Sequence, residues 1–187
     1  RLYQDDLGLE DLRRALAYYP HPVWLYLLSS EWSKIGQEEP FVGRTGDVAD
    51  DLGSRILAAR LVHTCMRLAF LLERRYAPYS KWFGAGFARL EIAPALTPFL
   101  RQALAAQTWQ ERGAALCGAY EMLAQRQNAL AIVPPVETRC SGFHDRPFQV
   151  IHGERIAATL QAQIDDPLLR RLRPFGSVNQ FSASTDL

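Results

Sequence analysis

The sequence predicts an all-α fold, a helical bundle around one long central helix from about Asp47 to Tyr76. Apolar residues recur there at steps of three and four, which is the period of an α-helix. Thr108 with Glu111 three residues later is the capping-box pattern that starts another helix. No run of strands alternates with helices, as a parallel nucleotide-binding sheet requires. The chain has 187 residues, 48% of them hydrophobic, so we expect one helical domain over residues 1–173 and a polar tail over 174–187.

Prolines mark the expected ends and starts of the helices that precede the central helix. Leu9 to Tyr19 carries a helical period that stops at Pro20, which predicts a short amphipathic helix. Pro22 fits the first turn of a second helix, expected to run to about Gly36. Gln37 to Gly46 is then expected to be a loop.

The central helix carries two apolar rows. The first is a continuous stripe formed by Val48, Leu52, Ile56, Ala59, His63, Met66 and Phe70. The second makes the latter half of the helix apolar on more than one side, through Leu57, Leu61, Cys65, Leu68 and Leu72. A helix surrounded by other helices needs such a distribution, so we place this helix at the centre of the fold.

Shorter elements are expected to follow the central helix after Pro78. In order they are a short helix over 81–90, a helix beginning near Pro94 or Pro98, a helix from Thr108 to about Leu130, a loop over 131–142, an extended segment over 148–151, and helices over 153–164 and 166–172.

Composition limits the classes of partner. The chain has 21 basic and 20 acidic residues, a net charge of +1, which gives no general attraction for nucleic acid or an anionic membrane. The most apolar stretch, Leu61 to Leu72, is too short to span a bilayer. Three widely spaced cysteines are typical of free thiols in a reducing compartment, so we expect a cytoplasmic protein.

Carboxylates in the predicted loop over 37–46 are the first candidate site. Glu38 and Glu39 stand there with Arg44, next to the expected start of the central helix. Loops resting on a rigid helix often carry binding groups, and a carboxylate can act as a base or hold a cation. Plain solvation of these charges is the more ordinary role.

Three arginines on the central helix form a second candidate. Arg60, Arg67 and Arg74 recur every seven residues and therefore share a face. They form either an anion-binding stripe or a solvated edge that makes ion pairs with neighbouring helices.

The helix break around Pro78 is the third candidate. Tyr79, Lys81 and Trp82 combine a hydroxyl, one of the only two lysines and an aromatic face, which suits a phosphate or a planar polar ligand. The alternative is a hydrophobic corner with basic side chains that reach solvent.

Familiar catalytic and metal motifs are absent from the sequence. We find no glycine-rich phosphate loop and no serine nucleophile elbow. Cys140, His144 and His152 lack the paired spacing of zinc sites, so no metal site is expected in this chain.

Two long strings carry a resemblance to a known family. They are "ALAYYPHPVWLYLLSSEWSKIGQEEPFVGRTGDVADDLGSRILAARLV" and "RLAFLLERRYAPYSKWFGAGFARL", and "FHDRPFQVIHGERIA" and "GSVNQFSASTD" extend the likeness over nearly the whole chain. The chain resembles domain-of-unknown-function family 4037, the helical C-terminal domain of bacterial nucleotidyltransferase-like proteins.

The resemblance implies a function in two parts. An N-terminal nucleotidyltransferase-like domain, the expected partner in cis, would hold Mg²⁺ and a nucleoside triphosphate, while this chain holds no cofactor and is not itself catalytic. The helical domain would bind the small-molecule acceptor or regulate the enzyme. The matching positions, expected to face the cleft between the two domains, are Glu38, Glu39, Arg44, Tyr79, Lys81 and Trp82.

Two other functions remain open. A purely structural or protein-interaction module needs no site and predicts that the corner at Tyr79 to Trp82 is buried. Helical domains of the HEPN type, some of which cleave RNA, place an Arg and a His four to six residues apart, and Arg139 and His144 fit that spacing. Their active form sets the pair at a helix start, whereas Ser141, Gly142 and Pro147 predict a loop here.

Overall fold

A computed structural model describes residues 6–176 and has the predicted all-α fold, with one two-stranded hairpin. Its elements are α1 (Leu9–Ala15), α2 (His21–Asp47), α3 (Asp51–Leu72), α4 (Ser80–Phe87), α5 (Ala93–Ala105), α6 (Trp109–Ala129), β1 (Ser141–Gly142), β2 (Gln149–Val150), α7 (Gly153–Ala162) and α8 (Pro167–Arg171). Of the predicted tail, only residues 174–176 lie within the described part.

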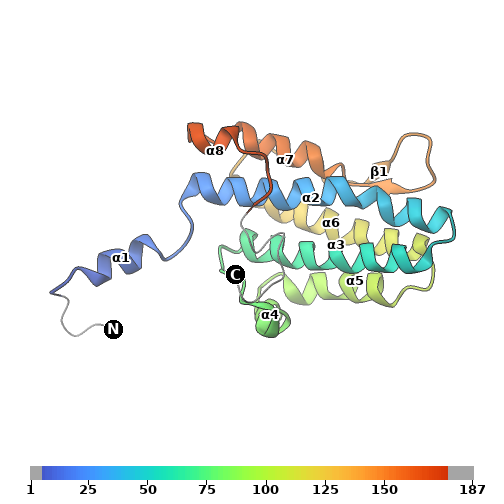
Figure 1. The fold of residues 1–187 in the computed structure, drawn as a ribbon, viewed down its shortest axis with the longest axis horizontal. Coiled ribbons are helices and arrows are strands. Elements are labelled where there is room, and N and C mark those ends of the chain that lie inside the picture. Colours follow the sequence, from blue (N-terminus) through green and yellow to red (C-terminus); the bar gives the residue numbers. More distant parts are fainter. Residues whose placement is uncertain (1–5, 177–187) are drawn as a thin grey trace.

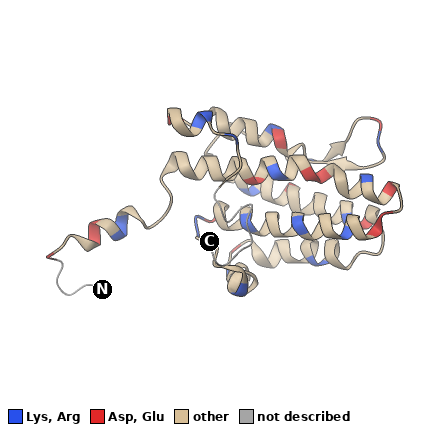
Figure 2. Cartoon of the chain, viewed as in Figure 1, with Lys and Arg blue, Asp and Glu red and all other residues tan. Residues whose placement is uncertain are grey.

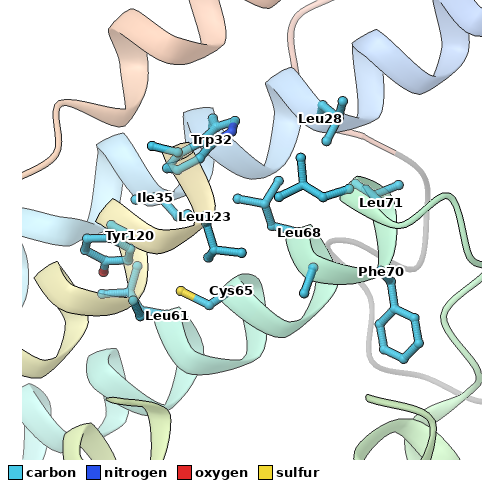
Figure 3. Packing of buried hydrophobic residues seen from close by; sticks show 14 of the residues in the cluster. Leu28, Trp32, Ile35, Leu61, Cys65, Leu68, Phe70, Leu71, Tyr120 and Leu123 are labelled. Atoms are coloured by element: carbon cyan, nitrogen blue, oxygen red, sulfur yellow. The ribbon is translucent and has the colours of Figure 1, made fainter. Parts of the chain in front are cut away.

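Helices α2, α3, α5 and α6 run side by side, and α7 lies along α2 (Figure 1). Side chains from three helices meet in the core, among them Trp32 of α2, Leu68 of α3 and Leu123 of α6 (Figure 3). The Trp32 indole N–H donates to Gln127 Oε1 over 2.7 Å, which satisfies the buried indole donor. Helix α1 stands apart from the bundle and buries no residue.

The predicted loop over 37–46 is wrong, because α2 continues through it to Asp47. Gly36, Pro40, Gly43 and Gly46 all disfavour a helix, and they suggested a break. Packing outweighs that cost: α3 and α7 cover α2, and Pro40 and Gly43 are themselves buried. Helix α2 is therefore 27 residues long and shares the centre of the fold with α3.

The central helix predicted from Asp47 to Tyr76 is present as α3, but it is shorter at both ends. It begins after Asp50, whose carboxylate accepts the Gly53 N–H over 2.8 Å as an N-cap. The first apolar row does not face the core over its early part, where Val48 and Leu52 are 75% and 70% exposed. The second row is the buried one, since it faces α2, α5 and α6.

Several predicted local signals are confirmed. Thr108 and Glu111 form the capping box of α6, in which the side chain of each residue accepts the backbone N–H of the other. Asp166 caps α8, followed by Pro167 in the first turn. In residues 6–176, no helix is both long enough and apolar enough to cross a membrane.

Candidate functional site

Residues of α2 contact all three arginines of the predicted stripe, of which Arg60 and Arg67 lie in α3 and Arg74 follows its end. Arg67 Nε lies 2.7 Å from Glu31 Oε1, and Arg60 pairs with Glu38. The Arg74 guanidinium lies 4.8 Å from the Trp24 ring centroid. Because α2 and α3 are antiparallel, acidic residues seven apart on α2 meet basic residues seven apart on α3; Figure 2 colours acidic residues red and basic residues blue on these two helices. The arrangement is the second of the two interpretations, ion pairs with a neighbouring helix.

Glu38 and Glu39 are both buried, and they face different neighbours. Glu38 turns to α3, where one carboxylate oxygen pairs with Arg60. Glu39 turns to α7 and accepts the backbone N–H groups of Ile151 over 2.6 Å and Gly153 over 3.0 Å. Burial raises the pKa of the Glu39 carboxyl to about 7, against the opposing effect of these two hydrogen bonds.

The corner at the start of α4 is exposed. Tyr79 and Trp82 are 57% and 54% exposed, and Lys81 Nζ lies 5.4 Å from the Trp82 ring centroid. Arg44, on the last turns of α2, is also exposed and lies over the Phe41 ring. Helix α4 packs on α3, whereas Glu39 faces α7. The predicted set of six residues is thus divided among separate surfaces of the described chain.

A cavity of about 540 Å³ opens between the loop that follows α6 and the first turns of α7. Polar groups of several kinds share its wall with apolar side chains. The lining residues are Pro135, Val136, Glu137, Arg139, Cys140, Ser141, Ile151, His152, Arg155, Ile156 and Thr159. A concave, partly apolar surface with a few convergent polar groups is typical of small-molecule sites.

Ser141, His152 and Glu154 form a row beside this cavity, in which Ser141 and His152 line the wall and only these two lie within hydrogen-bonding distance of each other. Ser141 Oγ lies 3.0 Å from His152 Nε2, and His152 Nδ1 lies 3.7 Å from Glu154 Oε1. The hairpin brings the first two together, because Ser141 pairs with Val150, two residues before the histidine. His152 adopts a left-handed backbone, with φ of 58°, at the N-cap of α7.

Buried contacts fix the position of this row. Glu39 holds the backbone on both sides of His152 through its two hydrogen bonds. Gly153 packs so closely on α2 that a Cβ there would lie 2.6 Å from the Trp32 carbonyl oxygen. The first turn of α7 is therefore held against α2, and Glu39 acts on the cavity by positioning its wall.

The cavity carries unequal positive charges. Arg139 Nη1 lies 3.1 Å from Glu121 Oε2, so its charge is partly neutralised. The Arg155 side chain has no ion pair or hydrogen bond within residues 6–176. A guanidinium without a partner on a cavity wall can bind a carboxylate or phosphate.

The structure places Arg139 and His144 away from any helix start. His144 lies exposed at the hairpin turn with φ of 53°, where its ring contacts Phe143 at 4.6 Å. Arg139 pairs with Glu121 of α6. The HEPN arrangement of an Arg and a His at a helix start is therefore not formed.

The sequence did not predict Ser141 and Arg155 as site residues, and His152 was considered only as a metal ligand. The signal available was the string "FHDRPFQVIHGERIA", which contains His152, Glu154 and Arg155. The approach of Ser141 to His152 depends on hairpin register, which two-residue strands do not reveal in the sequence.

Comparison with known proteins gives one match. The model of a family described as "Domain of unknown function (DUF4037)" matches residues 1–83. This segment includes α1, α2, α3 and the start of α4, and it ends before the cavity begins. No curated protein and no solved structure matches the chain.

Proposed function

We propose that this chain, whose residues 1–83 match the model of the DUF4037 family of domains of unknown function, is the substrate-binding half of a nucleotidyltransferase-like protein. An N-terminal domain in cis would hold Mg²⁺ and the nucleoside triphosphate. This helical domain, in the cytoplasm of a bacterium, would hold a small anionic acceptor. Holding the acceptor in place lowers the entropic cost of attack by its hydroxyl or amine on the nucleotide.

The observation that carries this proposal is Arg155 on the wall of the cavity, whose side chain has no ion pair among residues 6–176. Ser141 and His152 beside it offer groups for a ligand hydroxyl, and Ile151 and Ile156 offer an apolar surface. The exposed corner at Trp82 supports a second contact, with the N-terminal domain. A buried corner would have favoured a purely structural module.

A thermal-shift screen tests the proposal. The chain is heated with inorganic phosphate, dicarboxylates, sugar phosphates, aminoglycosides, nucleotides and short RNA. A ligand at a hundred times its Kd stabilises by about 2.7 kcal/mol, which for a chain of this size raises Tm by roughly 5–10 °C. We expect an anionic small molecule to give this shift, Arg155→Ala to abolish it, and Arg101→Ala, an exposed arginine of α5, to keep it. Equal shifts in both variants would contradict the proposal.

A protein-interaction module is the second candidate, and the observation that favours it is α1. Its leucines form an exposed stripe, with Leu9, Leu12 and Leu16 being 45%, 57% and 72% exposed. Apolar residues in such a row mark a contact surface. Replacing Leu12 and Leu16 by Ser is expected to weaken binding of a separately expressed N-terminal domain in a pull-down, and unchanged binding would exclude α1 as the contact.

A further inference from the structure

We propose that Ser141 is a nucleophile, with His152 as its general base and Glu154 as a positioning residue, and that the cavity takes carboxylic esters of small anionic molecules. The inference rests on the proposed function only in placing an anionic ligand in the same cavity. It adds an acyl-transfer or hydrolytic step that the nucleotidyltransferase proposal does not contain.

The contact between Ser141 and His152 meets the distance requirement for an activated serine. Ser141 Oγ lies 3.0 Å from His152 Nε2, within reach for transfer of the hydroxyl proton. Glu154 Oε1 lies 3.7 Å from Nδ1 on the other side of the ring, where a carboxylate favours the tautomer that leaves Nε2 free to accept. A nucleophile, a base and a group that orients the base form the general pattern of nucleophilic catalysis.

The serine is accessible to a substrate, and the histidine is held in a fixed position. Ser141 is exposed and lines the cavity, so a substrate can reach it. The His152 side chain is only 18% exposed, and its neighbours Ile151 and Gly153 are held by Glu39. The left-handed backbone of His152 is a conformation that costs free energy and persists where the surroundings fix it.

The first step forms an acyl-enzyme. Ser141 Oγ attacks the carbonyl carbon of the ester, and its proton passes to His152 Nε2. The Arg155 guanidinium, on the same wall, binds the carboxylate of the anionic substrate. The bond from carbon to the leaving oxygen then breaks, and the alcohol departs with the proton from His152.

The second step releases the acid. Water attacks the acyl carbon and gives a proton to His152, and the bond from this carbon to Ser141 Oγ breaks. Oγ recovers the proton from His152, so the serine and the histidine return to their starting states. The sum is one ester and one water converted to one acid and one alcohol.

Labelling with a fluorophosphonate probe tests the nucleophile directly. Ser141 Oγ would bond to phosphorus and release fluoride, giving one adduct per chain by intact mass, mapped to Ser141 by peptide analysis. His152→Asn, an exchange that a left-handed backbone tolerates, is expected to slow labelling by at least about 100-fold. Ser80→Ala, at the exposed start of α4, is the control and should label as the native chain does.

Ester hydrolysis tests the substrate class and the positioning residue. We expect 3-acetoxybenzoate, whose leaving group carries a carboxylate, to be cleaved faster than phenyl acetate, and Arg155→Ala to remove the difference. Glu154→Gln is expected to lower the rate and shift its pH profile. Labelling at another serine, an equal rate in His152→Asn, or no adduct on a chain shown to be folded by circular dichroism would overturn the inference. Loss of labelling with anion binding retained would leave the proposed function standing.

Discussion

Glu39 makes the stability of this protein depend on pH in a direction opposite to that of a salt-bridged carboxylate. Its pKa is raised from 4.5 to about 7 because the side chain is buried between α2 and α7. The folded chain therefore binds this proton more tightly than the unfolded chain does. The associated stability is fully present below the unfolded pKa and is lost as pH rises through about 7.

The size of the effect follows from the two pKa values. A shift of one pKa unit corresponds to about 1.4 kcal/mol. Integrated between pH 5 and pH 8, the difference at Glu39 amounts to about 2.5 kcal/mol of stability lost on going to the higher pH. Glu39→Gln keeps the size of the side chain and removes its charge, so this variant is expected to lack that loss.

Urea unfolding followed by circular dichroism measures the difference. The free energy of unfolding is determined for both proteins at pH 5 and pH 8, and the native value is subtracted from the variant value at each pH. Other titrating groups are common to both proteins and cancel. We expect the difference to grow by about 2.5 kcal/mol toward pH 8. A difference that stays constant within about 0.5 kcal/mol would refute the assignment of a buried, neutralisable carboxyl at Glu39.

Three further predictions concern packing and exposure. Arg67→Met should cost about 3–5 kcal/mol in urea unfolding, because it removes the ion pair between Arg67 and the buried Glu31, and adding Glu31→Leu should recover most of this loss. Gly153→Ala should destabilise by about 1–3 kcal/mol, since its methyl would meet the backbone of α2, whereas Gly113→Ala, with open space around it, should stabilise by up to about 1 kcal/mol. Lys81→Ala should leave Tm within about 2 °C of the native value, as expected for an exposed side chain.

The limits of sequence-based prediction are clearest in α2. Pro40 and the glycines from Gly36 to Gly46 are helix breakers in isolation, and they predicted a loop. The helix persists because its neighbours bury it, a cause that no local pattern contains. In α3 the helical period was predicted correctly, but it could not say which of the two apolar rows is buried, because both rows satisfy a helical period. Only the positions of α2, α5 and α6 decide which row is covered.

The candidate site shows the same division. The sequence marked Glu38 and Glu39 as candidate binding carboxylates, yet the contacts of Glu39 became visible only when α7 was found beside it. Arg60 and Arg67 could be placed on one face of a helix from their spacing. Whether that face met solvent or acidic residues of another helix depended on the antiparallel register of α2 and α3.

What the sequence determined by itself is the all-α class, the helix starts that carry a cap and the existence of a long α3. These follow from side-chain period and from hydrogen bonds made within a few residues, as at Thr108 and Asp166. Tertiary structure decided the length of α2, the buried face of α3 and the meeting of Ser141 with His152. Those features depend on contacts between residues distant along the chain, and such contacts form only when the helices and the hairpin pack together.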